Sequence, residues 1–136
     1  MAACTCANLR QATRVVSQAF DAALQPSGLR ATQFTLLATL AGLGEMPVSR
    51  LAETMVMDRT TLTRNLKPLV RDGLVTIGAE QDRRVRIVRL TEDGRQAFAA
   101  ARPLWQRAQE RMIGRLGTDS WAELLRGLSA AVAAAR

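Results

Sequence analysis

The chain has 136 residues, close to the usual size of one domain, which leaves little room for a second catalytic domain. Its 19 Lys and Arg against 12 Asp and Glu give a formal net charge of +7, so a polyanion is the leading class of partner, although many soluble proteins are basic without binding nucleic acid. The chain has no His, which argues against an enzyme and a cofactor, and its two Cys are too few for a disulfide framework. It has no apolar run of membrane-spanning length, and its first residues lack the layout of a signal peptide, so we expect a cytoplasmic protein without membrane contact.

Two helices are predicted in the first third of the chain. Apolar residues recur at three- and four-residue intervals from Ala7 to Leu24, and Pro26-Ser27-Gly28 ends this pattern. A second helix begins near Thr32 and ends before the breaker-rich segment 42–47.

Two short helices joined by a tight turn follow. The segment Val48–Met55 gives two helical turns with one apolar face, and Val56-Met57-Asp58 interrupts it. Asp58 is predicted to cap the next helix, which runs to Gly73, because its carboxylate accepts hydrogen bonds from unpaired backbone N–H groups. Two such helices form a helix-turn-helix.

The second helix of this pair has two different sides. Its apolar residues gather on one side at 100° per residue and are predicted to pack inward: Leu62, Leu66, Leu69 and Val70. The opposite side holds only cationic or hydroxyl residues and no carboxylate: Thr60, Thr61, Arg64, Lys67 and Arg71. We interpret this side as a DNA-reading face, the alternative being an ordinary exposed helix face. Pro68 should bend the last turn.

A β-hairpin is predicted next. The β-branched-rich runs Leu74–Ile77 and Val85–Leu90 are separated by the charged segment 78–84. A charged hairpin tip beside a helix-turn-helix is typical of the wing of a winged helix, whose arginine can enter the minor groove. The alternative is a generic polar loop.

The remaining helices are expected to build a dimer. Thr91 should cap a long helix that Pro103 kinks, and a last helix follows from residues 118–119. Because 30–91 already completes a winged helix-turn-helix, the helices of 7–25 and 92–135 are left with apolar faces that two copies could bury together. We therefore predict one mainly α (α+β) domain over 1–136 that forms a homodimer, the alternative being a monomer in which these helices fold back.

Over nearly the whole chain, the sequence resembles the multiple antibiotic resistance regulator (MarR) family. The resemblance is carried, in order, by Leu51-Ala52-Glu53, 59–64, 69–75, Asp82-Arg83-Arg84 and Leu90-Thr91-Glu92-Asp93-Gly94. It implies a triangular dimer, held by the terminal helices, that binds a palindromic operator and is released by a small molecule or thiol modification. It also implies that Asp82 orients Arg84 toward the minor groove. The sequence departs from the family at Arg30, where many relatives have a Thr or Ser cap.

The predicted function is that of a sequence-specific DNA-binding transcriptional regulator, most simply a repressor. Arg64 is the best candidate for a bidentate guanine contact, and Ser49 and Arg50 are expected to contact backbone phosphates. The full set of expected DNA-contacting residues is Ser49, Arg50, Arg59, Thr60, Thr61, Arg64, Asn65, Lys67, Arg83, Arg84 and Arg86. The alternative function is a winged-helix module for protein–protein contacts, which would not bind duplex DNA with an affinity that falls steeply as the salt concentration rises.

Two kinds of effector site are suggested by the sequence. An apolar pocket between the dimerising helices and the winged unit could include Phe20, Phe34 and Trp105, although such residues more often belong to the core. Cys4 and Cys6 place two thiols one residue apart before the first helix, where they could bind a metalloid or metal or react with an oxidant. An incidental N-terminal tail is the alternative reading of this pair.

Overall fold

The computed structural model describes residues 3–79 and 84–136 of the chain. Six α-helices and three strands are found in this part. In chain order they are α1 (Thr5–Leu24), a 3-10 turn (Gln25–Ser27), α2 (Ala31–Leu43), β1 (Met46–Pro47), α3 (Val48–Met55), α4 (Arg59–Arg71), β2 (Val75–Ala79), β3 (Arg86–Leu90), α5 (Glu92–Leu116) and α6 (Thr118–Ala135). None of the helices in the described ranges combines the length and the apolar character that a membrane span requires.

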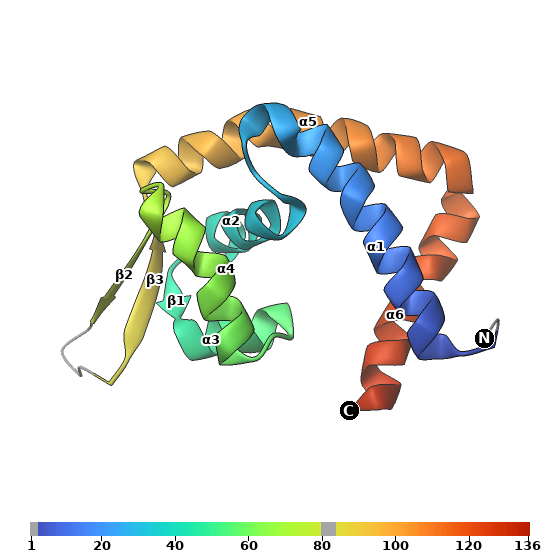
Figure 1. Cartoon of the computed structure of the whole chain (residues 1–136), viewed down its shortest axis with the longest axis horizontal. Coiled ribbons are helices and arrows are strands. Elements are labelled where there is room, and N and C mark those ends of the chain that lie inside the picture. Colours follow the sequence, from blue (N-terminus) through green and yellow to red (C-terminus); the bar gives the residue numbers. More distant parts are fainter. Residues whose placement is uncertain (1–2, 80–83) are drawn as a thin grey trace.

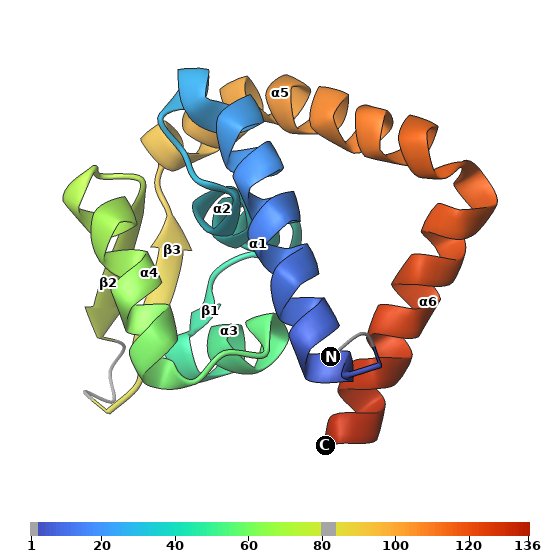
Figure 2. The same cartoon turned by 45° about the vertical axis from the view of Figure 1, so that its right-hand side comes forward.

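The molecule has two halves joined by one long helix. The helices α2, α3 and α4 pack beside a small antiparallel sheet in one half, and α1 and α6 form the other half (Figure 1). Helix α5 runs from the end of β3 across the top to α6, and the side view shows the same arrangement (Figure 2). The strand order is β1-β3-β2, with Met46 opposite Val88 and Val75 opposite Leu90.

The core lies in the first half and reaches α5. Leucines from α2, α3 and α4 are fully or almost fully buried and include Leu36, Leu37, Leu51, Leu62, Leu66 and Leu69. The inward positions predicted for the three leucines of α4 are confirmed, whereas the prediction for Val70 is wrong, because it lies 42% exposed in the last turn of α4. Between α2 and α5 the ring of Phe34 lies 5.3 Å from that of Phe98 and 5.7 Å from that of Trp105. This aromatic cluster fixes α5 against the helix-turn-helix, because each ring buries a large apolar surface.

The predicted winged helix-turn-helix fold is confirmed, and two local features differ from expectation. Helix α4 contains Pro68, as expected, but ends at Arg71 and not at Gly73, and a short strand, β1, is added where the sequence indicated only a breaker. Its two residues pair with β3, which a two-residue sequence pattern could not predict.

The start of α2 shows how the chain manages without a Thr or Ser cap. The Arg30 backbone N–H donates to Gln33 Oε1 at 2.9 Å, and the Ala31 N–H donates to Asp21 Oδ1 at 2.7 Å. The Asp21 carboxylate, which lies on α1, therefore satisfies one of the N–H groups that have no partner within α2, in place of a hydroxyl cap at position 30.

Candidate nucleic-acid interface

The turn between α3 and α4 sets the direction of α4. Val56 has φ +53°, the left-handed conformation that usually ends a helix at Gly or Asn, and the Met57 N–H donates to the Ala52 carbonyl at 2.9 Å. Asp58 then caps α4 as predicted: its carboxylate accepts from the Thr61 N–H at 2.7 Å and from the Thr61 hydroxyl at 3.1 Å. These hydrogen bonds lower the pKa of Asp58 below its ordinary value.

The outward side of α4 forms a shallow basic depression. It has a volume of about 390 Å³ and is lined by Arg59, Thr60, Thr63, Arg64 and Lys67. All five side chains are exposed, and α4 contains no Asp or Glu. The structure thus brings four of the predicted DNA-contacting residues together and adds Thr63. The 100° spacing places Thr63 on this side as well, so the same hydroxyl pattern that indicated Thr60 and Thr61 could have indicated it.

Two other predicted residues of α4 have partners within the protein. The Thr61 hydroxyl is engaged by Asp58, and Asn65 Nδ2 lies 3.9 Å from the sulfur of Met57. Both side chains are half-buried. Their contribution to DNA contact stays a prediction, whereas their structural role at the start of α4 is direct.

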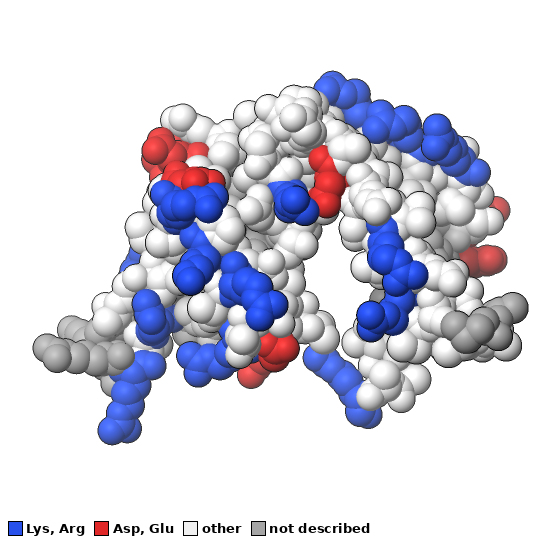
Figure 3. Space-filling view, viewed as in Figure 1, with Lys and Arg blue, Asp and Glu red and all other residues white. Residues whose placement is uncertain are grey.

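The residues expected to contact phosphates surround this depression. Ser49 and Arg50 lie exposed in the first turn of α3. Figure 3 shows Lys and Arg side chains gathered over the half that contains α3, α4 and the hairpin, with a second row over α5. A duplex placed against α4 would therefore meet positive charge on both sides of that helix.

The wing is anchored at its base. The Thr91 hydroxyl lies 2.7 Å from the Gly73 carbonyl oxygen and accepts from the Gly94 N–H at 2.9 Å, which ties the end of β3 to α4 and α5. Arg84 and Arg86 are exposed near the tip, and Asp82 and Arg83 lie outside the described residues. The pairing of Asp82 with Arg84 stays a prediction.

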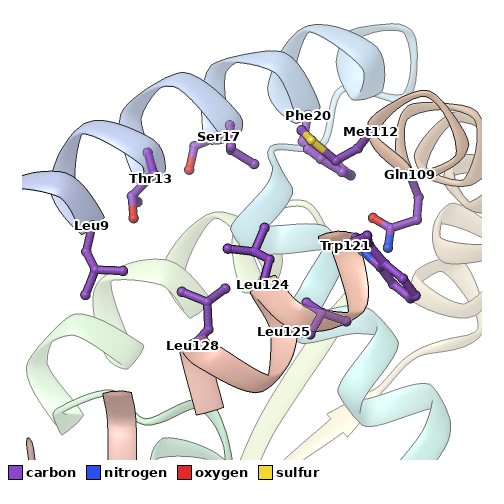
Figure 4. A pocket seen from close by; sticks show the side chains of 12 residues that line it. Leu9, Thr13, Ser17, Phe20, Gln109, Met112, Trp121, Leu124, Leu125 and Leu128 are labelled. Atoms are coloured by element: carbon purple, nitrogen blue, oxygen red, sulfur yellow. The ribbon is translucent and has the colours of Figure 1, made fainter. Parts of the chain in front are cut away.

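An apolar groove runs between α1 and α6 in the other half. It has a volume of about 390 Å³ and is lined mainly by Leu, Val, Phe, Met and Trp side chains from α1, α5 and α6 that point toward one another (Figure 4). Leu124 and Leu125 remain 46% and 44% exposed, so this surface is not covered within one chain. The groove matches the apolar faces that the sequence left without a partner.

The suggested effector pocket takes a different form. Phe34 and Trp105 are stacked in the core and do not line the groove, whereas Phe20 does. The three aromatic residues therefore do not share one pocket among the described residues, because the stack fills the space between α2 and α5.

Cys4 and Cys6 lie exposed at the start of α1. Cys4 is the N-cap residue, and its carbonyl oxygen accepts from both the backbone N–H and the side-chain amide of Asn8, at 3.0 and 2.8 Å. Within the described ranges no group of three or more His, Cys, Asp or Glu side chains is placed to hold a metal ion. The pair is thus open to reagents and sits at a structural position of α1.

Comparison with known proteins gives matches over this entire arrangement. The model of the MarR family matches residues 29–85. The chain is 40% identical to the Mycobacterium tuberculosis transcriptional regulator MosR, crystallised in complex with DNA, over 97% of this chain and 96% of that one, with a TM-score of 0.89. A MarR mutant from E. coli in complex with operator DNA is 23% identical, covers 90% of this chain and 89% of its own, and has a TM-score of 0.81, which shows a shared fold.

Curated relatives agree with these structures. An uncharacterised helix-turn-helix transcriptional regulator of Bacillus subtilis (strain 168), YwoH, is 26% identical over 90 residues, and a second one, YdgJ, is 26% identical over 112 residues. The chain spans 66% of the length of each of these two proteins.

Proposed function

The chain belongs to the MarR family, and from this membership we propose that it is a cytoplasmic transcriptional regulator that binds palindromic double-stranded DNA as a homodimer. The observation that carries the proposal is the outward side of α4, where cationic and hydroxyl side chains line one depression and no carboxylate is present. A duplex phosphate backbone attracts such a surface, and a helix of this size fits the major groove.

Each part of the interface has its own role in the proposal. Arg64 presents a planar fork to a guanine edge, because it is exposed in the second turn of α4, where recognition helices reach base edges. Lys67, Arg50 and Ser49 contact phosphates and fix the register. Arg84 enters the minor groove from the wing and responds to its width.

A selection from random duplex DNA with the purified protein tests this function. We expect a two-fold palindrome with half-sites about one helical turn apart. Arg64→Ala should then weaken binding to the selected duplex by about 5- to 150-fold. Arg84→Ala should weaken binding and flatten its dependence on salt by about one unit of slope. The matched control is Arg126→Ala on α6, which removes an exposed arginine that lines neither the α4 depression nor the apolar groove.

Failure to enrich any duplex, or binding without a steep salt dependence, would favour the protein–protein module instead. Equal losses for Arg64→Ala and Arg126→Ala would show that charge alone, and not the reading face, drives binding.

The homodimer is proposed on the apolar groove. Its exposed leucines and valine from α1 and α6 offer one chain a continuous surface that a second copy can bury, and an isologous contact would give the two-fold symmetry of a palindrome. Leu124→Glu should therefore produce monomers in sedimentation experiments. Leu43→Glu is the control, because Leu43 is 64% exposed at the end of α2, outside the groove. A dimer that survives Leu124→Glu and dissociates with Leu43→Glu would place the contact elsewhere.

We propose further that the protein is a repressor whose DNA binding is relieved at Cys4 and Cys6. A peroxide converts one thiolate to a sulfenic acid with release of water or an alcohol, and the second thiol displaces water to form a disulfide. Cys4 is the N-cap residue and Cys6 the second residue of α1, so a disulfide between them would close a small, strained ring, distort the first turn of α1 and break the bonds from Asn8 to Cys4. A metalloid bound by both thiols would likewise tie residues 4 and 6 together.

Mass spectrometry after peroxide or arsenite treatment, with operator binding measured in parallel, tests the thiol site. We expect loss of two mass units with peroxide, weaker binding, and no response in the Cys4→Ser, Cys6→Ser variant. Release of DNA by peroxide in that variant would assign the response to another residue.

A further inference from the structure

Thr60 and Thr63 are the two uncharged residues that line the α4 depression, and the surroundings of Thr63 suggest which base it contacts. We propose that the methyl group of Thr63 contacts the C5-methyl group of a thymine beside the guanine bound by Arg64, which makes α4 selective for thymine at that position. The proposal rests on the proposed DNA-binding function and adds to it the identity of a base.

The geometry of Thr63 favours a base contact. It is exposed in the second turn of α4, adjacent in sequence to Arg64 and three residues from Thr60, and it lines the same depression as both. Residues near the N-terminus of a recognition helix approach base edges in the major groove. Thymine alone offers a methyl group there, so an apolar contact distinguishes it from the other three bases.

The hydroxyl of Thr63 must also be satisfied, because a dry interface would penalise an unpaired hydroxyl. Three threonines within the helices of this protein donate to the carbonyl four residues earlier: Thr35 at 2.9 Å, Thr39 at 2.8 Å and Thr54 at 2.9 Å. Thr63 makes no hydrogen bond through its side chain to any residue in the described ranges. The Arg59 carbonyl, one turn earlier in α4, is available for the same bond, which would leave the methyl group facing outward.

The other two threonines of this segment lack that option. Thr61 already donates to Asp58, and the residue four before Thr60 is Val56, which lies outside α4 in the left-handed conformation. Thr60 can therefore satisfy its hydroxyl at the interface only through a base, a phosphate or water. Of the three, Thr63 alone can hide its hydroxyl in the helix and present a methyl group.

Two substitutions at position 63 separate the methyl group from the hydroxyl. Thr63→Val keeps an outward methyl group and removes the hydroxyl, whereas Thr63→Ser keeps the hydroxyl and removes the methyl group. Selections from random duplexes are run with the wild type and both variants, and circular dichroism confirms that each variant is folded. Thr54→Ser on α3 is the matched control, because Thr54 is an exposed helical threonine outside the depression.

The expected result is one thymine position in each half-site that the wild type and Thr63→Val select and Thr63→Ser does not. Replacing that thymine by uracil removes only the C5-methyl group and should weaken wild-type binding by about fourfold for each half-site. The same replacement should leave Thr63→Ser binding unchanged.

A duplex that is enriched equally by the wild type, Thr63→Ser and Thr54→Ser, with no effect of uracil, would overturn the methyl contact while the DNA-binding function stands. Loss of thymine selection in Thr63→Val as well would assign the discrimination to the hydroxyl and overturn the proposal too. No enriched duplex for the wild type would instead refute the proposed function itself.

Discussion

Gly94, in the first turn of α5, has no room for a side chain. A Cβ atom at this position would lie 2.7 Å from Leu90 Cδ1 and still closer to the Leu74 carbonyl oxygen. That oxygen also accepts from the Thr91 N–H at 3.1 Å, so it is held between the hairpin and α5. In Gly94→Ala the backbone of residue 74 or the start of α5 must shift, because the obstacle is main chain and not a flexible side chain.

The cost of Gly94→Ala can be set against the gain that alanine brings to a helix. Overpacking against fixed neighbours costs about 1–3 kcal/mol, and weakening the Thr91–Leu74 bond adds about 1 kcal/mol. The higher helix propensity of Ala returns up to about 1 kcal/mol. The net loss of about 2 kcal/mol corresponds to a Tm lower by roughly 6–8 °C for a chain of this length.

Thermal unfolding followed by circular dichroism measures this effect at one fixed protein concentration, since association would make Tm concentration-dependent. Gly114→Ala in the same helix is the control, because a Cβ there meets nothing within 4 Å, and it should raise Tm by about 3 °C. Equal Tm values for Gly94→Ala and Gly114→Ala would refute the steric reasoning.

Three further predictions concern the helix ends. Val56→Asn should raise the free energy of unfolding by about 1 kcal/mol in denaturant titrations, because a β-branched residue is strained at φ +53° and Val56 is 58% exposed; a decrease would contradict this. Asp21→Ala should lower the free energy of unfolding by about 1 kcal/mol through loss of its bond to Ala31, and an unchanged value would show that water replaces it. Asp58→Ala should lower Tm by a few degrees at pH 7. The folded-state pKa of Asp58 lies below its ordinary 3.8, so its stabilisation is present above pH 3.8 and is lost as the pH falls through the lowered value. The difference in Tm between Asp58→Ala and the wild type should therefore shrink in melts at acidic pH below 3.8, and a constant difference would refute the charge argument.

Local sequence patterns predicted most of the winged unit, because the residues that form a helix cap or an apolar helix face lie within one or two helical turns of one another. The Asp58 cap could be predicted because an acidic residue precedes a run of periodic apolar residues. The Thr91 cap, with Gly94 in close contact with residue 74, joins the end of β3 directly to the start of α5. Thr91 and Gly94 occur in a segment that carries the MarR resemblance, which therefore has a structural cause as well as a functional one.

Features that depend on contacts between distant residues could not be predicted. Asp21 caps α2 across ten positions, and Phe34 meets Trp105 across the molecule, so neither partner was apparent from spacing. The net charge of the chain likewise does not indicate where on the surface the basic side chains lie. The row of basic side chains over α5 contributes to the same total as those around α4, and only the structure separates the two surfaces (Figure 3).

The two halves of the molecule are mechanically connected through α5. Its 25 residues give a length of about 37 Å, with Thr91 and Gly94 fixing the wing at one end and Met112 lining the groove near the other. A tilt of α5 by about 5° about its groove end would move the wing end by roughly 3 Å, which is close to the rise of one base pair. If two copies pack along the groove as proposed, small changes in that packing would be enough to misplace both α4 helices on a palindromic site. In the proposed thiol response, distortion of the first turn of α1 at Cys4 and Cys6 would have to be transmitted along α1, which packs against α5, and it would not involve a contact with the DNA-reading residues.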